Sequence, residues 1–160
     1  MIRNPYRALI SFWNWEKTGN NTGLANTGSF CSTEFREFVF NAVSRWCELI
    51  EDWVTWGKNL KVVFFEKLSR NPVEETREIL NHLKIPVDSS RLVCLSRHLE
   101  GRYHRRKVSL GNPFSSEQVA VTSWAIERVG RLLQERLNIN IPDYQLDQGE
   151  EEPPVLCPLH

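Results

Sequence analysis

The sequence contains no long hydrophobic run. No apolar stretch approaches the ~20 residues that a transmembrane helix needs, and the first residues do not place an apolar segment behind a basic one, as a secretory signal peptide does. We therefore expect neither a membrane anchor nor a targeting signal within these 160 residues.

Cysteine is infrequent, and its spacing excludes the common zinc-binding patterns. The chain has no Cys-x-x-Cys pair among its four cysteines, Cys31, Cys47, Cys94 and Cys157, although zinc knuckles and thioredoxin-like sites use that spacing. Cys94 stands four residues before His98, but no second pair of ligands follows in a segment of fixed geometry. We expect no metal site, while several disulfide pairings remain open.

The chain also lacks an excess of either charge. The 20 Lys and Arg residues balance the 20 Asp and Glu residues, which excludes a bulk nucleic-acid binder that relies on an overall basic surface. Any anion site must therefore be local. The 41% hydrophobic and 11% aromatic content is typical of a globular chain, and 160 residues allow one domain with a sizeable core.

Apolar residues recur at helical spacing in several segments, and the start signals are clear. Two Asn-Pro pairs favour helix starts, because proline fits the first turn of a helix and asparagine caps it. The first predicted helix begins at Asn4-Pro5. The others are expected from Ser32 or Thr33 to Gly57, from Asn71-Pro72 to before Pro86, from Asp88 to about Leu99, and from Ser115 or Ser116 to about Leu137.

One short segment has the composition of a buried strand. Residues 60–65 (LKVVFF) are rich in β-branched and aromatic side chains, which suits a parallel sheet. Together with the helices they predict an α/β fold, mostly helical, with a short parallel-sheet remnant. Because a sheet needs about three strands to be stable on its own, we expect the chain to be the second half of a larger fold, that is, a fragment.

The end of the chain differs from the rest. Residues 142–160 are acidic and proline-rich and contain neither Lys nor Arg. Such a composition favours disorder. We therefore assign residues 1–141 to one domain and residues 142–160 to a disordered tail.

An arginine stands directly before the first predicted helix. Arg3 precedes Asn4-Pro5, and Ser11 follows eight residues after Arg3. A guanidinium and a hydroxyl beside a helix N-terminus can bind a phosphate. The alternative is a capped helix with a solvated arginine, and the spacing alone favours that alternative.

Two segments resemble those of a known family. Residues 3–11 (RNPYRALIS) resemble the Arg-[Asp/Asn]-Pro-x5-Ser signature with which sulfotransferases hold the 3′-phosphate of 3′-phosphoadenosine 5′-phosphosulfate (PAPS). Residues 62–68 (VVFFEKL), followed by Asn71-Pro72 and a helix, are similar to the strand of that family that ends in Tyr-Glu-x-Leu. Two matches in the same order are more specific than one.

The likeness extends to the WSC-domain-containing sulfotransferases, which are Golgi type II membrane proteins that modify glycans. It rests on residues 4–9, 91–94 and 100–101 and on Arg105-Arg106, and it covers about residues 2–137. The resemblance implies a P-loop-like α/β fold, PAPS as the sulfuryl donor and a glycan hydroxyl as the acceptor, with sialic acid as a candidate. It also implies Golgi localisation of the full-length protein through an anchor outside this chain.

The resemblance assigns site residues as well. Arg3 and Ser11 would bind the 3′-phosphate, and a basic loop with Arg105 and Arg106 would close over it, although Lys107-Val108 stand where the family often has glycine. The family's 5′-phosphosulfate loop belongs upstream of Arg3, and the catalytic base is unknown. A glycine-rich stretch at residues 23–29 superficially resembles a Walker A loop, but it lacks the lysine and the preceding strand, so we reject it.

These features lead to two hypotheses. The first is the C-terminal portion of a PAPS-dependent carbohydrate sulfotransferase that is inactive as an isolated chain. The second is a non-catalytic module from a truncated isoform or an incomplete gene model. Trp13 and Trp15 are the tryptophans placed to stack on a sugar or adenine, with core packing as the default. Asn20-Asn21-Thr22 would be a glycosylation acceptor in a lumenal chain.

Overall fold

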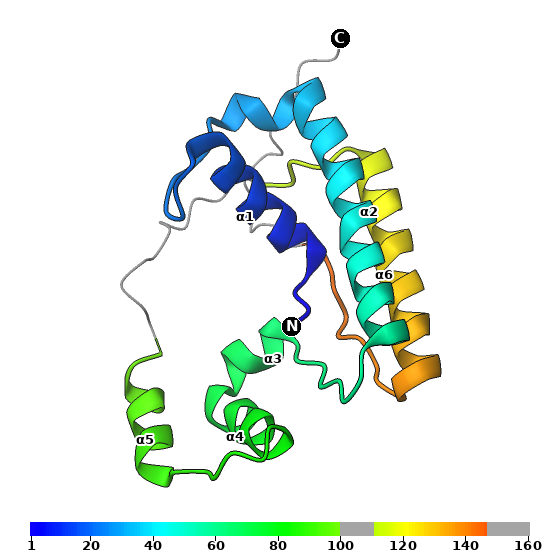
Figure 1. Cartoon of the computed structure of the whole chain (residues 1–160). Coiled ribbons are helices and arrows are strands. Elements are labelled where there is room, and N and C mark those ends of the chain that lie inside the picture. The colour runs from blue at the N-terminus through cyan, green and yellow to red at the C-terminus, as the bar shows by residue number, and fades with distance from the viewer. Residues whose placement is uncertain (100–110, 147–160) are drawn as a thin grey trace. The chain divides into compact units, whose positions relative to one another are not determined.

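A computed structural model describes residues 1–99 and 111–146 (Figure 1). The chain forms two compact units, and each is considered by itself. The first unit contains Met1–Asn4 and Lys58–His104, and the second contains Pro5–Gly57 and Arg105–His160. Within the described residues the chain passes from one unit to the other at Asn4–Pro5 and at Gly57–Lys58. The single domain expected for residues 1–141 stays a prediction.

The second unit contains the longest helices. These are α1 (Pro5–Thr18), the 3-10 helix η1 (Thr27–Cys31), α2 (Thr33–Trp56) and α6 (Ser116–Leu137). Their starts follow the predicted caps: the Ser32 side chain accepts a hydrogen bond from the Phe35 amide, and Ser115 and Gln118 form a capping box. α6 ends at Asn138, whose φ of 55° is left-handed, a conformation that asparagine tolerates at a helix end.

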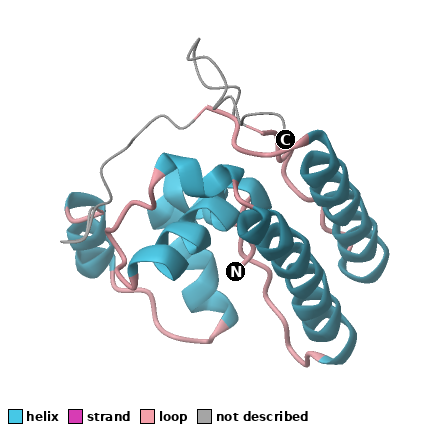
Figure 2. Cartoon of the chain, turned by 90° about the horizontal axis from the view of Figure 1, so that it is seen from above, coloured by secondary structure: helices cyan, strands magenta, loops and turns pink. Residues whose placement is uncertain are grey.

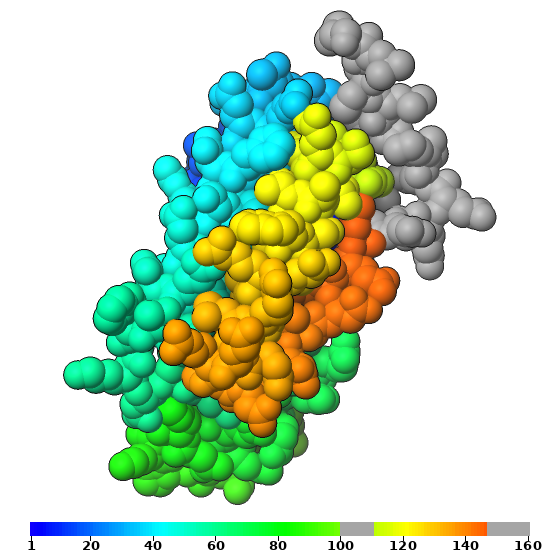
Figure 3. Space-filling view, turned by 90° about the vertical axis from the view of Figure 1, so that its right-hand side faces the viewer, coloured from blue at the N-terminus to red at the C-terminus, as the bar shows by residue number. Residues whose placement is uncertain are grey.

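Helices α2 and α6 pack side by side and run parallel. Arg36 near the start of α2 pairs with Glu117 near the start of α6, and Glu51 further along α2 pairs with Arg128. Between these pairs the Cys47 thiol lies 3.7 Å from the Ala125 carbonyl oxygen. Figure 3 shows the two helices in contact along their length. Fully buried side chains on both helices form this interface: Val39, Ala125, Val129 and Leu133.

An aromatic cluster joins α1 to this pair. Trp13 is 1% exposed, and its ring lies 5.2 Å from that of Phe35. Phe30 of η1 lies 5.1 Å from Phe35 on another side. Tyr6 packs edge-on against Phe114 at 5.4 Å, and its hydroxyl donates to the Val119 carbonyl. Aromatic pairs in these geometries stabilise a core beyond their buried area.

The first unit contains three shorter helices. They are α3 (Phe65–Arg70), α4 (Pro72–His82) and α5 (Ser89–Arg97). Pro72 begins α4 as predicted, and the Asp88 side chain caps α5 by accepting from the Ser90 and Arg91 amides. Lys61 pairs with Glu78 at 2.6 Å. The helices predicted from sequence are therefore confirmed, with α5 ending at Arg97.

The predicted α/β fold with a parallel-sheet remnant is wrong. Within residues 1–99 and 111–146 the structure contains helices and loops but no strand (Figure 2). Residues 60–63 are loop, Phe64 forms an isolated bridge, and Phe65 already begins α3. One isolated parallel bridge joins Ile2 to Phe64. A strand needs a ladder of backbone partners along its length, and this single bridge supplies only two hydrogen bonds.

The structure describes only the first part of the tail that is predicted to begin at residue 142. Residues 142–146 are described, and Tyr144 there is 7% exposed. Residues 147–160 lie outside the described residues, so disorder of that segment stays a prediction.

Burial in the α2–α6 interface makes Cys47 unreactive. Its burial, together with the nearby Glu51 carboxylate, raises the pKa of the Cys47 thiol to about 11. At pH 8 roughly one such thiol in a thousand is ionised, because each unit below the pKa lowers the thiolate fraction tenfold. We expect iodoacetamide at pH 8 to alkylate the exposed Cys94 and to spare Cys47 in native protein, as measured by peptide mass spectrometry. Both should react in guanidinium, and equal native rates would contradict the burial.

Candidate functional site

A backbone pairing brings the two sequence motifs together in the first unit. The Ile2 amide donates to the Val63 carbonyl at 2.8 Å, and the Phe65 amide donates to the Ile2 carbonyl at 2.8 Å. Ile2 is 7% exposed and Phe64 is 3% exposed. The segment before Arg3-Asn4-Pro5 is therefore fixed alongside the start of the Phe-Phe-Glu segment.

Side chains extend this contact beyond the bridge. The Arg3 guanidinium lies over the Phe65 ring, 4.6 Å from its centroid. The Asn4 amide donates to Glu66 Oε1 at 2.9 Å. Asn4 itself is 5% exposed. We call Arg3, Asn4, Phe65 and Glu66 the motif junction.

The junction combines a guanidinium and a carboxylate, Arg3 and Glu66. Only the guanidinium attracts an anion, and the negative charge of the carboxylate opposes it. When a guanidinium stacks on an aromatic ring, the flat face of the guanidinium contacts the ring. The N–H groups of the guanidinium lie in its own plane, which is the plane in which phosphate or sulfate oxygens bind. Glu66 Oε2 is buried and has no hydrogen-bond partner among the described residues. Because a buried carboxylate oxygen is costly without a partner, Glu66 is a candidate functional residue that sequence reasoning treated only as part of a motif.

The other predicted site residues are distributed differently. Ser11 lies on α1, partly buried, and belongs to the second unit, whereas Arg3 belongs to the first. The two are therefore not joined within one unit. Arg105 and Arg106 lie outside the described residues. Trp13 is in the aromatic core, as the default predicted, and Trp15 is 46% exposed.

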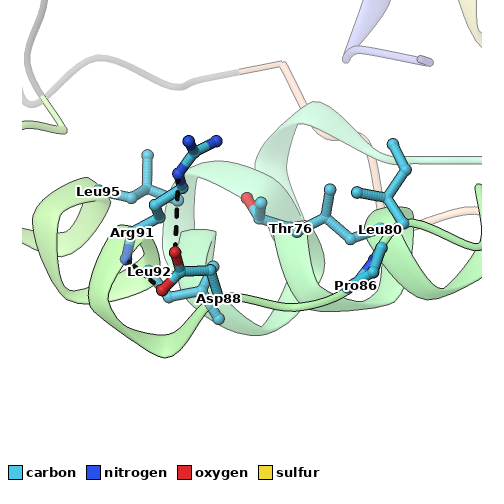
Figure 4. A pocket seen from close by; sticks show the side chains of 8 residues that line it. Thr76, Leu80, Pro86, Asp88, Arg91, Leu92 and Leu95 are labelled. Carbon is cyan, nitrogen blue, oxygen red and sulfur yellow. Dashed lines mark hydrogen bonds and ion pairs between the residues drawn. The ribbon is translucent and has the colours of Figure 1, made fainter.

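A pocket of about 460 Å³ lies between α4 and α5 in the first unit (Figure 4). Its lining is mainly aliphatic, with one ion pair, in which Arg91 Nε stands 3.7 Å from Asp88 Oδ2. Hydrogen bonds from the Ser90 hydroxyl and from the Ser90 and Arg91 amides lower the pKa of Asp88, so this carboxylate serves as a helix cap. The lining residues are Thr76, Leu80, Ile85, Pro86, Asp88, Arg91, Leu92 and Leu95.

The described part of the chain contains neither a candidate metal site nor a candidate membrane span. Residues 1–99 and 111–146 contain no group of three His, Cys, Asp or Glu side chains that could hold a metal ion. His98 Nδ1 lies 2.9 Å from the Cys94 carbonyl oxygen, so their four-residue spacing is explained by local helix geometry. Across those same residues, no helix is both long enough and apolar enough to span a membrane.

Comparison with known proteins identifies relatives for most of the chain. It is 32% identical over 114 residues to a WSCD (WSC domain-containing) family member of Drosophila pseudoobscura pseudoobscura. It is 28% identical to a WSCD family member of Drosophila melanogaster and 30% identical to one of Aedes aegypti. Each match covers 67% of this chain and 35% of the relative. No family model matches, and no solved structure matches.

These relatives support part of the resemblance stated from the motifs. The chain is similar to WSCD family members, and it spans about a third of the length of the curated relatives it matches. Their names specify neither a donor nor an acceptor.

The Asn4–Glu66 hydrogen bond should contribute measurably to stability. We expect Glu66→Ala to lower the free energy of unfolding by about 1.5 to 3 kcal/mol, the usual range for a hydrogen bond to a charged group. Glu66→Gln, which keeps an acceptor oxygen, should lose less. Urea unfolding followed by tryptophan fluorescence measures both.

The matched control is Glu75→Ala in the first turn of α4, where loss of a favourable helix-end charge costs less than about 1 kcal/mol. Equal losses for Glu66→Ala and Glu75→Ala would show that the junction hydrogen bond adds nothing.

Proposed function

We propose that the chain is part of a PAPS-dependent sulfotransferase that transfers a sulfuryl group to a hydroxyl of a glycan. The observation that carries the proposal is the motif junction. The two segments that resemble sulfotransferase motifs are about 60 residues apart in sequence, yet Arg3 contacts Phe65 and Asn4 bonds Glu66. Two unrelated chance matches would have no reason to lie in contact.

The residues present suit the nucleotide's 3′-phosphate. Arg3 offers a planar set of N–H donors and Ser11 offers a hydroxyl, the donor types that phosphate oxygens accept. α1 begins two residues after Arg3 and is 14 residues long, so its N-terminal amides carry a partial positive charge. In the proposal Arg3 and Ser11 anchor the phosphate, and Arg105 or Arg106 closes over it.

This anchor positions the donor and does not itself react. PAPS would supply the activated sulfuryl group when bound, and Arg3 and Ser11 would fix the nucleotide by its opposite end. Such positioning lowers the activation free energy of sulfuryl transfer. The reacting groups lose their orientational freedom when the donor binds, and not in the transition state. The catalytic base and the 5′-phosphosulfate loop are not assigned to any residue of this chain.

Two further parts of the proposal concern the setting of the full-length protein. We place it in the Golgi lumen, with a sialylated glycan as the candidate acceptor.

Removing the proposed phosphate ligands should weaken binding of adenosine 3′,5′-bisphosphate. In the full-length protein we expect Arg3→Ala to raise the Kd about ten- to a hundredfold, because a hydrogen bond to a charged group is worth about 1.5 to 3 kcal/mol and each 1.4 kcal/mol is tenfold. Ser11→Ala should have a smaller effect, because its hydroxyl is a neutral donor. Isothermal titration calorimetry gives both constants.

Arg131→Ala is the matched control, since Arg131 is an exposed arginine of α6, and its Kd should equal that of the wild type. If Arg3→Ala stays folded and binds the bisphosphate like the wild type, the assignment fails and Arg3 only precedes a helix. If the wild type itself does not bind the bisphosphate, the non-catalytic alternative is favoured.

A further inference from the structure

The loop after α1 contains a compact turn built on three residues. Asn20 Oδ1 accepts one hydrogen bond from the Thr22 amide at 2.9 Å and another from Thr22 Oγ1 at 3.1 Å. These bonds engage the oxygen of the Asn20 amide and not its nitrogen, Nδ2. The turn therefore holds the hydroxyl of Thr22 against the amide of Asn20.

This turn lies outside the core of the second unit. Asn20 and Asn21 are exposed, whereas the residues that anchor the loop are buried. Asn14 Oδ1 accepts from the Ala25 amide at 2.7 Å. Trp13 Nε1 donates to Ser29 Oγ at 3.0 Å. The core thus fixes the loop behind the turn and leaves Asn20 exposed. Figure 1 shows this loop in blue after α1.

Local sequence explains why the chain turns here. Thr18 Oγ1 donates to the Asn14 carbonyl at 2.7 Å at the end of α1, and Gly19 takes a φ of 61°, which glycine adopts without strain. Gly23 packs on Thr18 so closely that a Cβ there would lie 2.2 Å from Thr18 Oγ1. The turn therefore depends on residues 18–23 and not on the distant parts of the fold.

We propose that Asn20 is an N-glycosylation site of the full-length protein. The proposal rests on the lumenal location in the proposed function, because the modifying reaction takes place in the secretory pathway. The tripeptide Asn20-Asn21-Thr22 matches the acceptor pattern. The folded structure leaves Asn20 exposed, as a residue that carries a bulky, solvated glycan must be.

The reaction transfers an oligosaccharide from a lipid-linked oligosaccharyl diphosphate. A bond forms between Asn20 Nδ2 and the anomeric carbon of the first sugar. The bond between that carbon and the diphosphate oxygen breaks, the lipid diphosphate leaves with the electron pair, and Nδ2 loses one proton. In the folded chain the Thr22 hydroxyl donates to Asn20 Oδ1 and leaves Nδ2, the reacting atom, outside this bond.

The test uses the full-length protein with an added C-terminal Asn-Gly-Thr tag, expressed in cultured animal cells. The tag reports lumenal delivery independently of Asn20. Digestion with peptide N-glycosidase F and mass spectrometry of the Asn20 peptide measure occupancy. We expect most of the wild-type Asn20 peptide to carry a glycan, and Asn20→Gln and Thr22→Ala each to lose one glycan.

Two controls separate the hydroxyl requirement from general damage. Thr22→Ser keeps the hydroxyl and should keep the glycan, and Asn21→Gln changes the neighbouring asparagine and should leave occupancy unchanged. A glycosylated tag with an unmodified Asn20 peptide would overturn this inference and leave the lumenal location standing. An unmodified tag would overturn both the inference and the lumenal part of the proposed function.

Discussion

The backbone pairing of Ile2 with Val63 and Phe65 is the constraint on which the candidate site depends. It consists of only two hydrogen bonds, each of 2.8 Å, but Ile2 and Phe64, the residue between the two bonded partners, are buried apolar residues. Burial protects the hydrogen bonds from competing water. The pairing therefore fixes the register that sets Arg3 over Phe65 and the Asn4 amide on Glu66.

The helices could be predicted because their signals are local. Asn71-Pro72, Asp88 and Ser115 each stand within a few residues of the backbone groups that they cap or replace, and the apolar spacing that follows needs no knowledge of a partner. The prediction of a strand at residues 60–65 was wrong because the signals that decide a strand are not local. β-branched and aromatic composition suits a strand, but the pairing that makes one is non-local, and only Ile2 pairs with this segment among the described residues.

The site could be predicted in part for a similar reason. The resemblance selected Arg3 and the Phe65-Glu66 segment from short patterns, and the structure places them in contact. The role of Glu66 could not be predicted, because its bond to the Asn4 amide joins positions 62 residues apart. Burial of its second oxygen likewise depends on packing. No sequence signal marked Glu66 beyond its place in the motif.

The error in fold class and the proposed function are separable. The sheet was expected from the composition of residues 60–65, whereas the proposed phosphate ligands were chosen from the Arg-Asn-Pro-x5-Ser pattern. One bridge and a cation–π contact hold the Arg3 guanidinium against Phe65 within the first unit, without a full strand. Because the contact rather than the sheet positions Arg3, the sulfotransferase proposal depends on the motif junction and remains testable through it.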